Sequence, residues 1–149
     1  NQSRRQRQMC IRDRNKNDEF KRVKIRNFIK NLELEGLDND KFSLTIKNLK
    51  FANESIKYFV EKNLKDNSTI SNINKFVILN KNFFLQPEEV VFRSLTEVLK
   101  GVGKKYYPVR GRKIDKLIYQ IKKDNSFITT LGNCVIKKVN NSVIVSKER

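Results

Sequence analysis

The sequence predicts an α+β fold: a helical hairpin first, then a small mixed domain with a β-hairpin, two helices and a three-stranded antiparallel meander. Two amphipathic helical patterns precede a polar stretch, and short apolar runs separated by Asn and Gly end the chain. With 149 residues and 38% apolar content, the chain is long enough to bury a core. We expect residues 15–66 to be helical, 67–74 to be a linker and 75–149 to form the α+β domain.

Apolar residues at helical spacing predict the first two helices. In residues 18–35 they are Phe20, Val23, Phe28, Ile29 and Leu32, and Gly36 follows as a residue that can end the helix in the left-handed conformation. In the second helix, which Asp38 or Asp40 can cap, they are Phe42, Ile46, Leu49, Ala52, Ile56, Phe59, Val60 and Leu64. Because few residues join the helices, their apolar stripes are expected to pack against each other as a hairpin.

The remaining elements follow from turn residues and apolar runs. Residues 76–79 and 83–85 predict a β-hairpin around Asn80-Lys81-Asn82. Pro87 and two acidic residues begin a helix that Gly101 and Gly103 end. After an irregular loop at 104–113, the last predicted helix has Ile114, Leu117, Ile118 and Ile121 on its inner side. Strands at 127–131, 134–139 and 142–146 complete the meander, with Gly132-Asn133 and Asn140-Asn141 as tight turns.

The charge is strongly positive and unevenly distributed. Lys and Arg number 33 against 16 Asp and Glu, which gives a net charge of +17. Between residues 100 and 123, nine basic residues accompany a single acidic one, Asp115. Packing does not require such an excess of charge, so the composition indicates a polyanionic partner.

Several classes of active site are excluded by the residues the sequence lacks. There is no His, which excludes Ser-His-Asp, Cys-His and His-metal chemistry. Cys10 and Cys134 form no CxxC pair, so neither a disulfide framework nor a zinc site is expected, and the cytoplasm is the expected location. Cys134, among apolar neighbours, is expected to be a buried structural thiol. No phosphate-binding glycine motif occurs, and the longest apolar run, residues 76–79, is too short for a membrane helix.

The loop at residues 104–113 is the main candidate site. Its members that can neutralise phosphates or stack on an unpaired base are Lys104, Lys105, Tyr106, Tyr107, Arg110, Arg112 and Lys113. RNA suits this combination better than duplex DNA, because its unpaired bases are accessible to aromatic rings. The alternative is that the tyrosines belong to the core and the cations form a solvated rim. Arg22 and Arg26, on one side of the first helix, form a smaller candidate set or a solvated helix face.

Two parts of the chain carry recognisable motifs. The first is Asn15-Lys16-Asn17-Asp18-Glu19-Phe20-Lys21-Arg22-Val23-Lys24-Ile25-Arg26, which resembles the segment that closes the ATP-binding domain of tRNA(Ile)-lysidine synthetases. The C-terminal part resembles the alphaproteobacterial form, in the order Gly103-Lys104-Lys105-Tyr106-Tyr107-Pro108-Val109-Arg110, Thr130-Leu131-Gly132-Asn133-Cys134 and Lys147-Glu148. Before Asn15 the family shows Asp-Pro-Ser or Asp-Pro-Thr, whereas Arg12, Asp13 and Arg14 stand here. We therefore expect residues 1–14 to be disordered or foreign to the fold.

The resemblance implies an enzyme that adenylates the wobble cytidine of CAU-anticodon tRNA(Ile) with ATP and then joins lysine to it. The family's Ser-Gly-Gly-x-Asp-Ser phosphate loop is not in this sequence. The chain is thus expected to be a C-terminal fragment that holds the tRNA, is inactive alone, contains no catalytic residue or metal site, and binds neither ATP nor lysine. The alternative function is a free-standing, non-enzymatic RNA-binding protein. A membrane-surface binder is less favoured, because the basic cluster is not on one amphipathic helix.

Overall fold

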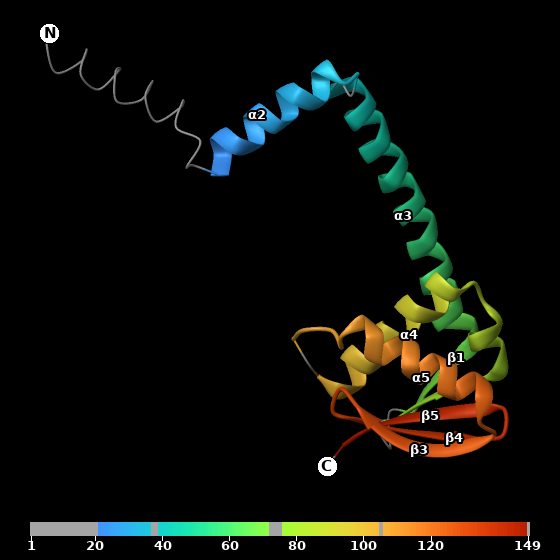
Figure 1. Ribbon diagram of the computed structural model, residues 1–149. Coiled ribbons are helices and arrows are strands. Elements are labelled where there is room, and N and C mark those ends of the chain that lie inside the picture. Colours follow the sequence, from blue (N-terminus) through green and yellow to red (C-terminus); the bar gives the residue numbers. More distant parts are fainter. Residues whose placement is uncertain (1–20, 37–38, 72–75, 105, 149) are drawn as a thin grey trace, which may run out of the picture. The chain divides into compact units, whose positions relative to one another are not determined.

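The computed structural model describes residues 21–36, 39–71, 76–104 and 106–148. Their elements are, in chain order, α2 (Lys21–Leu34), α3 (Asn39–Asn67), β1 (Ser68–Ser71), β2 (Phe76–Leu79), the 3-10 helix η1 (Lys81–Leu85), α4 (Glu88–Gly103), α5 (Gly111–Lys123), β3 (Ser126–Leu131), β4 (Cys134–Val139) and β5 (Ser142–Lys147) (Figure 1). The expected α+β class is confirmed. The chain divides into two units, Asn1–Phe51 and Ala52–Arg149, and α3 contributes to both.

In the first unit, the helices form as expected but their apolar stripes stay exposed. Gly36 has the predicted left-handed conformation, with φ +86°. Phe28 is 62% exposed and Leu49 is 65% exposed, whereas Val23 is buried. The expected burial of the two stripes against each other is therefore not observed, because an amphipathic pattern predicts an apolar face but does not specify what covers it. Residues 18–20 of the expected first helix, and residues 1–14, lie outside the described residues.

The second unit is built on one antiparallel sheet of five strands in the order β1-β2-β5-β4-β3. The predicted meander is confirmed as β3, β4 and β5. Gly132 and Asn133 both have positive φ, at 66° and 63°, which is the type I′ turn that suits the twist of a tight hairpin. Asn140, at the next turn, has φ 52°.

The predicted strand at residues 83–85 is wrong, because these residues belong to η1. The side chain of Asn80 accepts a hydrogen bond from the Phe83 N–H at 3.1 Å, so Asn80 caps a helical turn where a hairpin turn was expected. The hairpin partner of β2 is instead β1, which lies inside the expected linker at 67–74. Residues 72–75 of that linker are outside the described residues.

The core lies between the sheet and helices α4 and α5, which cover one face of it (Figure 1). Alternate residues of β2, β4 and β5 are buried, as expected for strands with one covered face. The least exposed core side chains, all at 0–1%, include Leu79, Phe83, Leu95, Leu99, Ile114, Ile136 and Val145. Three of the four predicted inner residues of α5, Ile114, Leu117 and Ile121, are buried, and the fourth, Ile118, is half-buried against the core.

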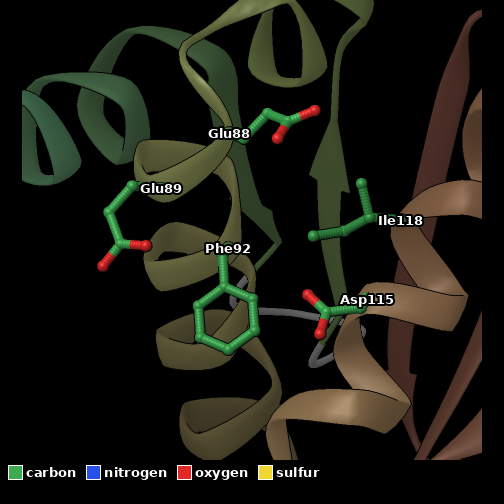
Figure 2. Close-up of a pocket in the computed structure, with 5 residues that line it drawn as sticks. All are labelled: Glu88, Glu89, Phe92, Asp115 and Ile118. Atoms are coloured by element: carbon green, nitrogen blue, oxygen red, sulfur yellow. The ribbon is translucent and has the colours of Figure 1, made fainter.

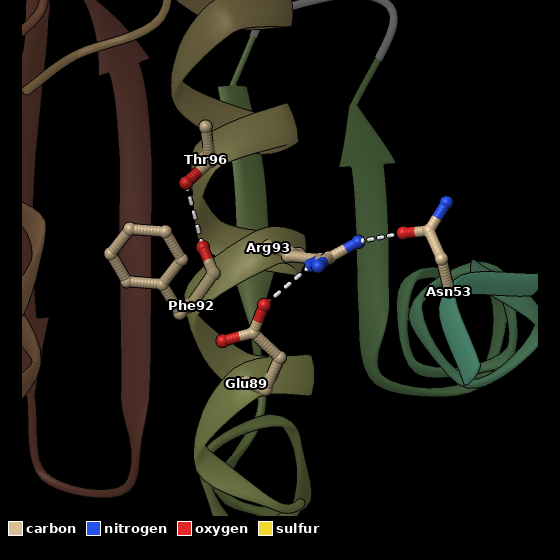
Figure 3. A network of polar contacts seen from close by, with 5 residues as sticks. All are labelled: Asn53, Glu89, Phe92, Arg93 and Thr96. Atoms are coloured by element: carbon tan, nitrogen blue, oxygen red, sulfur yellow. Dashed lines mark hydrogen bonds and ion pairs between the residues drawn. The ribbon is translucent and has the colours of Figure 1, made fainter. Parts of the chain in front are cut away.

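Polar contacts join the C-terminal half of α3 to α4 and η1. Arg93 on α4 donates to Asn53 Oδ1 at 2.6 Å and pairs with Glu89 at 2.7 Å, while Thr96 donates to the Phe92 carbonyl one helical turn earlier (Figure 3). Deeper inside, the Asn63 amide is 2% exposed. It donates to the Phe83 carbonyl at 3.3 Å and to Ser94 Oγ at 3.2 Å.

We predict that Asn63→Ala lowers the free energy of unfolding by about 1–3 kcal/mol, because it leaves the buried Phe83 carbonyl and Ser94 hydroxyl without a partner. The matched control is Lys62→Ala at the exposed neighbouring position, which should change it by less than about 0.5 kcal/mol. Urea unfolding of the two variants measures both values. Equal midpoints for them would contradict a structural role of the Asn63 amide.

Candidate nucleic-acid interface

The basic loop, which we define as residues 104–113, connects the end of α4 to the start of α5. Lys104 ends α4 in the left-handed conformation, with φ 50°, and α5 begins at Gly111. The expectation of an irregular segment up to Lys113 is therefore wrong for its last part: Gly111, Arg112 and Lys113 form the first turn of α5.

The loop is anchored by a close approach of two backbones. A Cβ on Gly103 would collide with the carbonyl oxygen of Gly132 and would lie 3.2 Å from Cys134 Sγ. On the other side, a Cβ on Gly132 would lie 2.7 Å from a methyl group of Val109. The tip of the β3–β4 hairpin thus touches both the end of α4 and the middle of the basic loop.

The two tyrosines of the loop are on the surface. Tyr106 is 87% exposed and Tyr107 is 75% exposed, so the alternative that they belong to the core is wrong. Their rings contact each other edge to face, with centroids 5.0 Å apart. Both rings therefore present aromatic surface to the solvent.

The loop's cations are exposed and without acidic partners among the described residues. The ion pairs found there join Arg93 to Glu89 and Lys122 to Glu88. Neither pair includes the described cations of the basic loop, Lys104, Arg110, Arg112 and Lys113, which are all exposed. Lys105 lies outside the described residues. The described cations of the loop thus gather positive charge that is not paired with a described carboxylate.

The start of α5 adds to this positive potential. Arg110 occupies the N-cap position without a side-chain cap, and the first turn contains no acidic residue. Helix N-termini carry partial positive charge from their free N–H groups, and acidic residues normally balance it. Here Arg112 and Lys113 reinforce the charge instead, which is a favourable arrangement for an anion such as phosphate.

The second predicted set, Arg22 and Arg26, is on α2 in the first unit. Both side chains are exposed, four residues apart on one side of the helix. Their role in binding stays a prediction.

The structure adds residues that the sequence analysis missed. A hollow of about 250 Å³ lies between α5 and β3 and includes Lys113 of the basic loop. Its other polar members are Lys116, Gln120, Thr129 and Thr130. In the sequence, the helical spacing of Lys113 and Lys116 could have indicated that these two lysines lie on one side of α5. That Thr129 and Thr130 of β3 join them in the hollow depends on tertiary packing.

A second hollow, of about 380 Å³, is acidic (Figure 2). Glu88, Glu89 and Phe92 line it from α4, and Asp115 and Ile118 line it from α5. Two of its carboxylates already face cations: Glu89 pairs with Arg93 at 2.7 Å and Glu88 with Lys122 at 3.8 Å. Among the described residues, no group of His, Cys, Asp and Glu could hold a metal ion.

Cys134 is buried, as predicted. Its side chain is fully buried, and the thiol donates to the Leu99 carbonyl at 3.4 Å. No helix in the described part of the chain is long and apolar enough to cross a membrane.

No family model matches the chain. Its relatives include a tRNA(Ile)-lysidine synthase from Wolbachia sp. subsp. Brugia malayi (strain TRS), 24% identical over 140 residues, and one from Wolbachia pipientis wMel, 23% identical over 140 residues. The resemblance to lysidine synthases is confirmed. Each alignment covers 93% of this chain, and the chain spans only 32% of the length of these lysidine synthases.

The anchor of the basic loop is testable at two glycines of α4. We predict that Gly103→Ala lowers the free energy of unfolding by about 1–3 kcal/mol, because the new methyl group collides with the Gly132 backbone. Gly101→Ala is the matched control: a Cβ there meets nothing within 4 Å, and the variant should gain about 0.5–1 kcal/mol in helix stability. Urea unfolding compares them, and a Gly103→Ala protein as stable as Gly101→Ala would refute the close contact.

Proposed function

We propose that this chain is the tRNA-binding C-terminal part of a tRNA(Ile)-lysidine synthase. The observation that carries the proposal is the basic loop, where two exposed tyrosines and four exposed cations lie on an anchored segment of a packed domain. Similarity to two lysidine synthases over 93% of the chain supports the choice of RNA and of this enzyme class.

The loop offers two kinds of contact with RNA. Lys104, Arg110 and the positive start of α5 neutralise phosphates, which provides affinity without reading sequence. Tyr106 and Tyr107 stack on bases that are not paired in a duplex. A folded tRNA provides both partners, because its stems carry dense phosphate charge and its loops and end expose unpaired bases.

In this proposal the complete enzyme divides its tasks between regions. ATP activates the wobble cytidine of CAU-anticodon tRNA(Ile), and lysine then displaces AMP to form lysidine. The sequence here contains no Ser-Gly-Gly-x-Asp-Ser phosphate loop. We therefore assign ATP and lysine to another part of the enzyme and tRNA positioning to this part, in the cytoplasm. The 149-residue chain alone is expected to bind tRNA without consuming ATP.

The runner-up, a free-standing RNA-binding protein without catalytic function, would use the same loop. The genomic sequence upstream distinguishes the two. An in-frame segment with the Ser-Gly-Gly-x-Asp-Ser motif supports the synthase, whereas a start codon and ribosome-binding site directly before this chain favours the runner-up.

A salt titration of tRNA affinity separates the two kinds of contact. Arg110→Ala should weaken binding and make the log–log salt dependence less steep by about 0.7–0.9, because one fewer counterion is released. Tyr107→Ala should cost about 1–3 kcal/mol of binding free energy with an unchanged slope, because stacking involves no counterion. The measurement is fluorescence anisotropy with a tRNA(Ile) transcript that carries the CAU anticodon.

Two controls accompany this titration. Lys57→Ala removes an exposed cation on α3 and should leave affinity and slope unchanged. Because Tyr107 is 75% exposed, its Ala variant should keep the melting temperature of the unsubstituted chain. An Arg110→Ala protein with unchanged affinity and slope would remove the basic loop from the interface, and ATP turnover by the chain with lysine and tRNA would refute the proposed division of tasks.

A further inference from the structure

The hollow between α5 and β3 adjoins the basic loop. Lys113 belongs to both, and Leu131, at the β3 end of the hollow, precedes the Gly132 that contacts Val109 of the loop. Along α5, Lys113, Lys116 and Gln120 follow at intervals of three and four residues, which places them on one side of the helix. A ligand held by the loop can therefore continue directly into the hollow.

The edge strand β3 contributes one polar side chain, the apolar side chain of Leu131 and part of its backbone. Thr129 is paired with Ile136, whose side chain is buried beneath the helices, so Thr129 also lies on the α5 side of the sheet. In a two-residue hairpin the closing pair, Leu131 and Cys134, is hydrogen-bonded. Hydrogen-bonded pairs alternate along an antiparallel ladder, so the N–H and C=O groups of Thr130 point outward from the sheet edge.

The polar groups of the hollow are available to a ligand. Among the described residues, the side chains of Lys113, Lys116, Gln120 and Thr129 make no hydrogen bond or ion pair. The floor is apolar, with Leu117 at 4% exposure and Leu131 half-buried. A volume of about 250 Å³ is below the roughly 300–1,000 Å³ of pockets for drug-sized ligands, which limits the ligand to about one nucleoside.

We propose that this hollow binds one unpaired nucleotide of an RNA. The inference rests on the proposed RNA-binding function and specifies its ligand: the base lies on Leu117 and Leu131, and Gln120, Thr129 and the Thr130 backbone bind its edge. Lys113 and Lys116 bind the phosphates on either side. RNA is favoured over a free nucleotide because the cations of the hollow continue into those of the loop, and a continuous chain of phosphates contacts both.

The test compares two fluorescein-labelled RNA hairpins of identical stem sequence, one with a single-nucleotide bulge and one fully paired. By anisotropy, the 149-residue chain should bind the bulged hairpin about tenfold more tightly, the discrimination expected from a base-edge contact of ordinary strength. Gln120→Ala and Thr129→Val should each reduce this preference severalfold and leave affinity for the paired hairpin unchanged. Lys123→Ala, on α5 but outside the hollow, should retain the full preference.

Thermal melts identify any variant that fails to fold. If one variant does, the other still tests the site, and Thr129→Val is expected to fold because it keeps the shape of the side chain. Equal affinity for the two hairpins, or a preference that survives substitution of both Gln120 and Thr129, overturns the nucleotide site and leaves the proposed function standing. Failure to bind either hairpin or tRNA overturns both proposals.

Discussion

The absence of a side chain at Gly103 is the constraint on which the candidate interface depends. It lets the end of α4 meet the backbone of Gly132 at the tip of the β3–β4 hairpin. Gly132 in turn contacts Val109, in the middle of the basic loop. At the far end of the loop the approach is not close, because a Cβ on Gly111 would be in ordinary contact, 3.4 Å from the ring of Phe92 on α4. The close contacts thus hold the loop at its start and middle.

This anchoring matters because bringing the cations and tyrosines of the loop together does not stabilise the folded chain when no ligand is bound. Like charges repel one another, and exposed aromatic rings do not contribute to the core. The buried residues of α4, among them Leu95 and Leu99, supply the stability that the loop does not. A segment that is already ordered loses less conformational entropy when it binds, so the anchoring favours affinity.

Local patterns in the sequence were sufficient for the meander and for much of the basic loop. Strands β3 to β5 alternate in burial, and Gly132-Asn133 has the residue types that a type I′ turn requires. The same reasoning failed where one residue type serves two structures, as at Asn80, which can form a hairpin turn or cap a helix. It also failed for β1, because Ser68–Ser71 has a single apolar residue and is ordered by pairing with β2.

The hollow between α5 and β3 could not be predicted for a related reason. Lys116, Gln120 and Thr129 are ordinary surface residues in sequence, and they come together only because α5 packs on β3. For Arg22 and Arg26, the helical spacing in the sequence predicts that the two side chains lie on one side of α2. The spacing does not predict whether they bind the same ligand as the loop. Residue composition therefore identified the chemistry of the loop, while tertiary packing determined which neighbours extend it.

Lysine footprinting with bound tRNA tests most directly whether the basic loop and the adjoining hollow form the RNA interface. The chain is acetylated briefly with and without a CAU-anticodon tRNA(Ile) transcript, and mass spectrometry gives the labelling of each lysine. Lys104, Lys113 and Lys116 should be protected severalfold by the tRNA, while Lys57 and Lys62, on α3, should react at the same rate in both samples. Unchanged labelling of Lys104, Lys113 and Lys116 under conditions where the tRNA is bound would contradict this assignment.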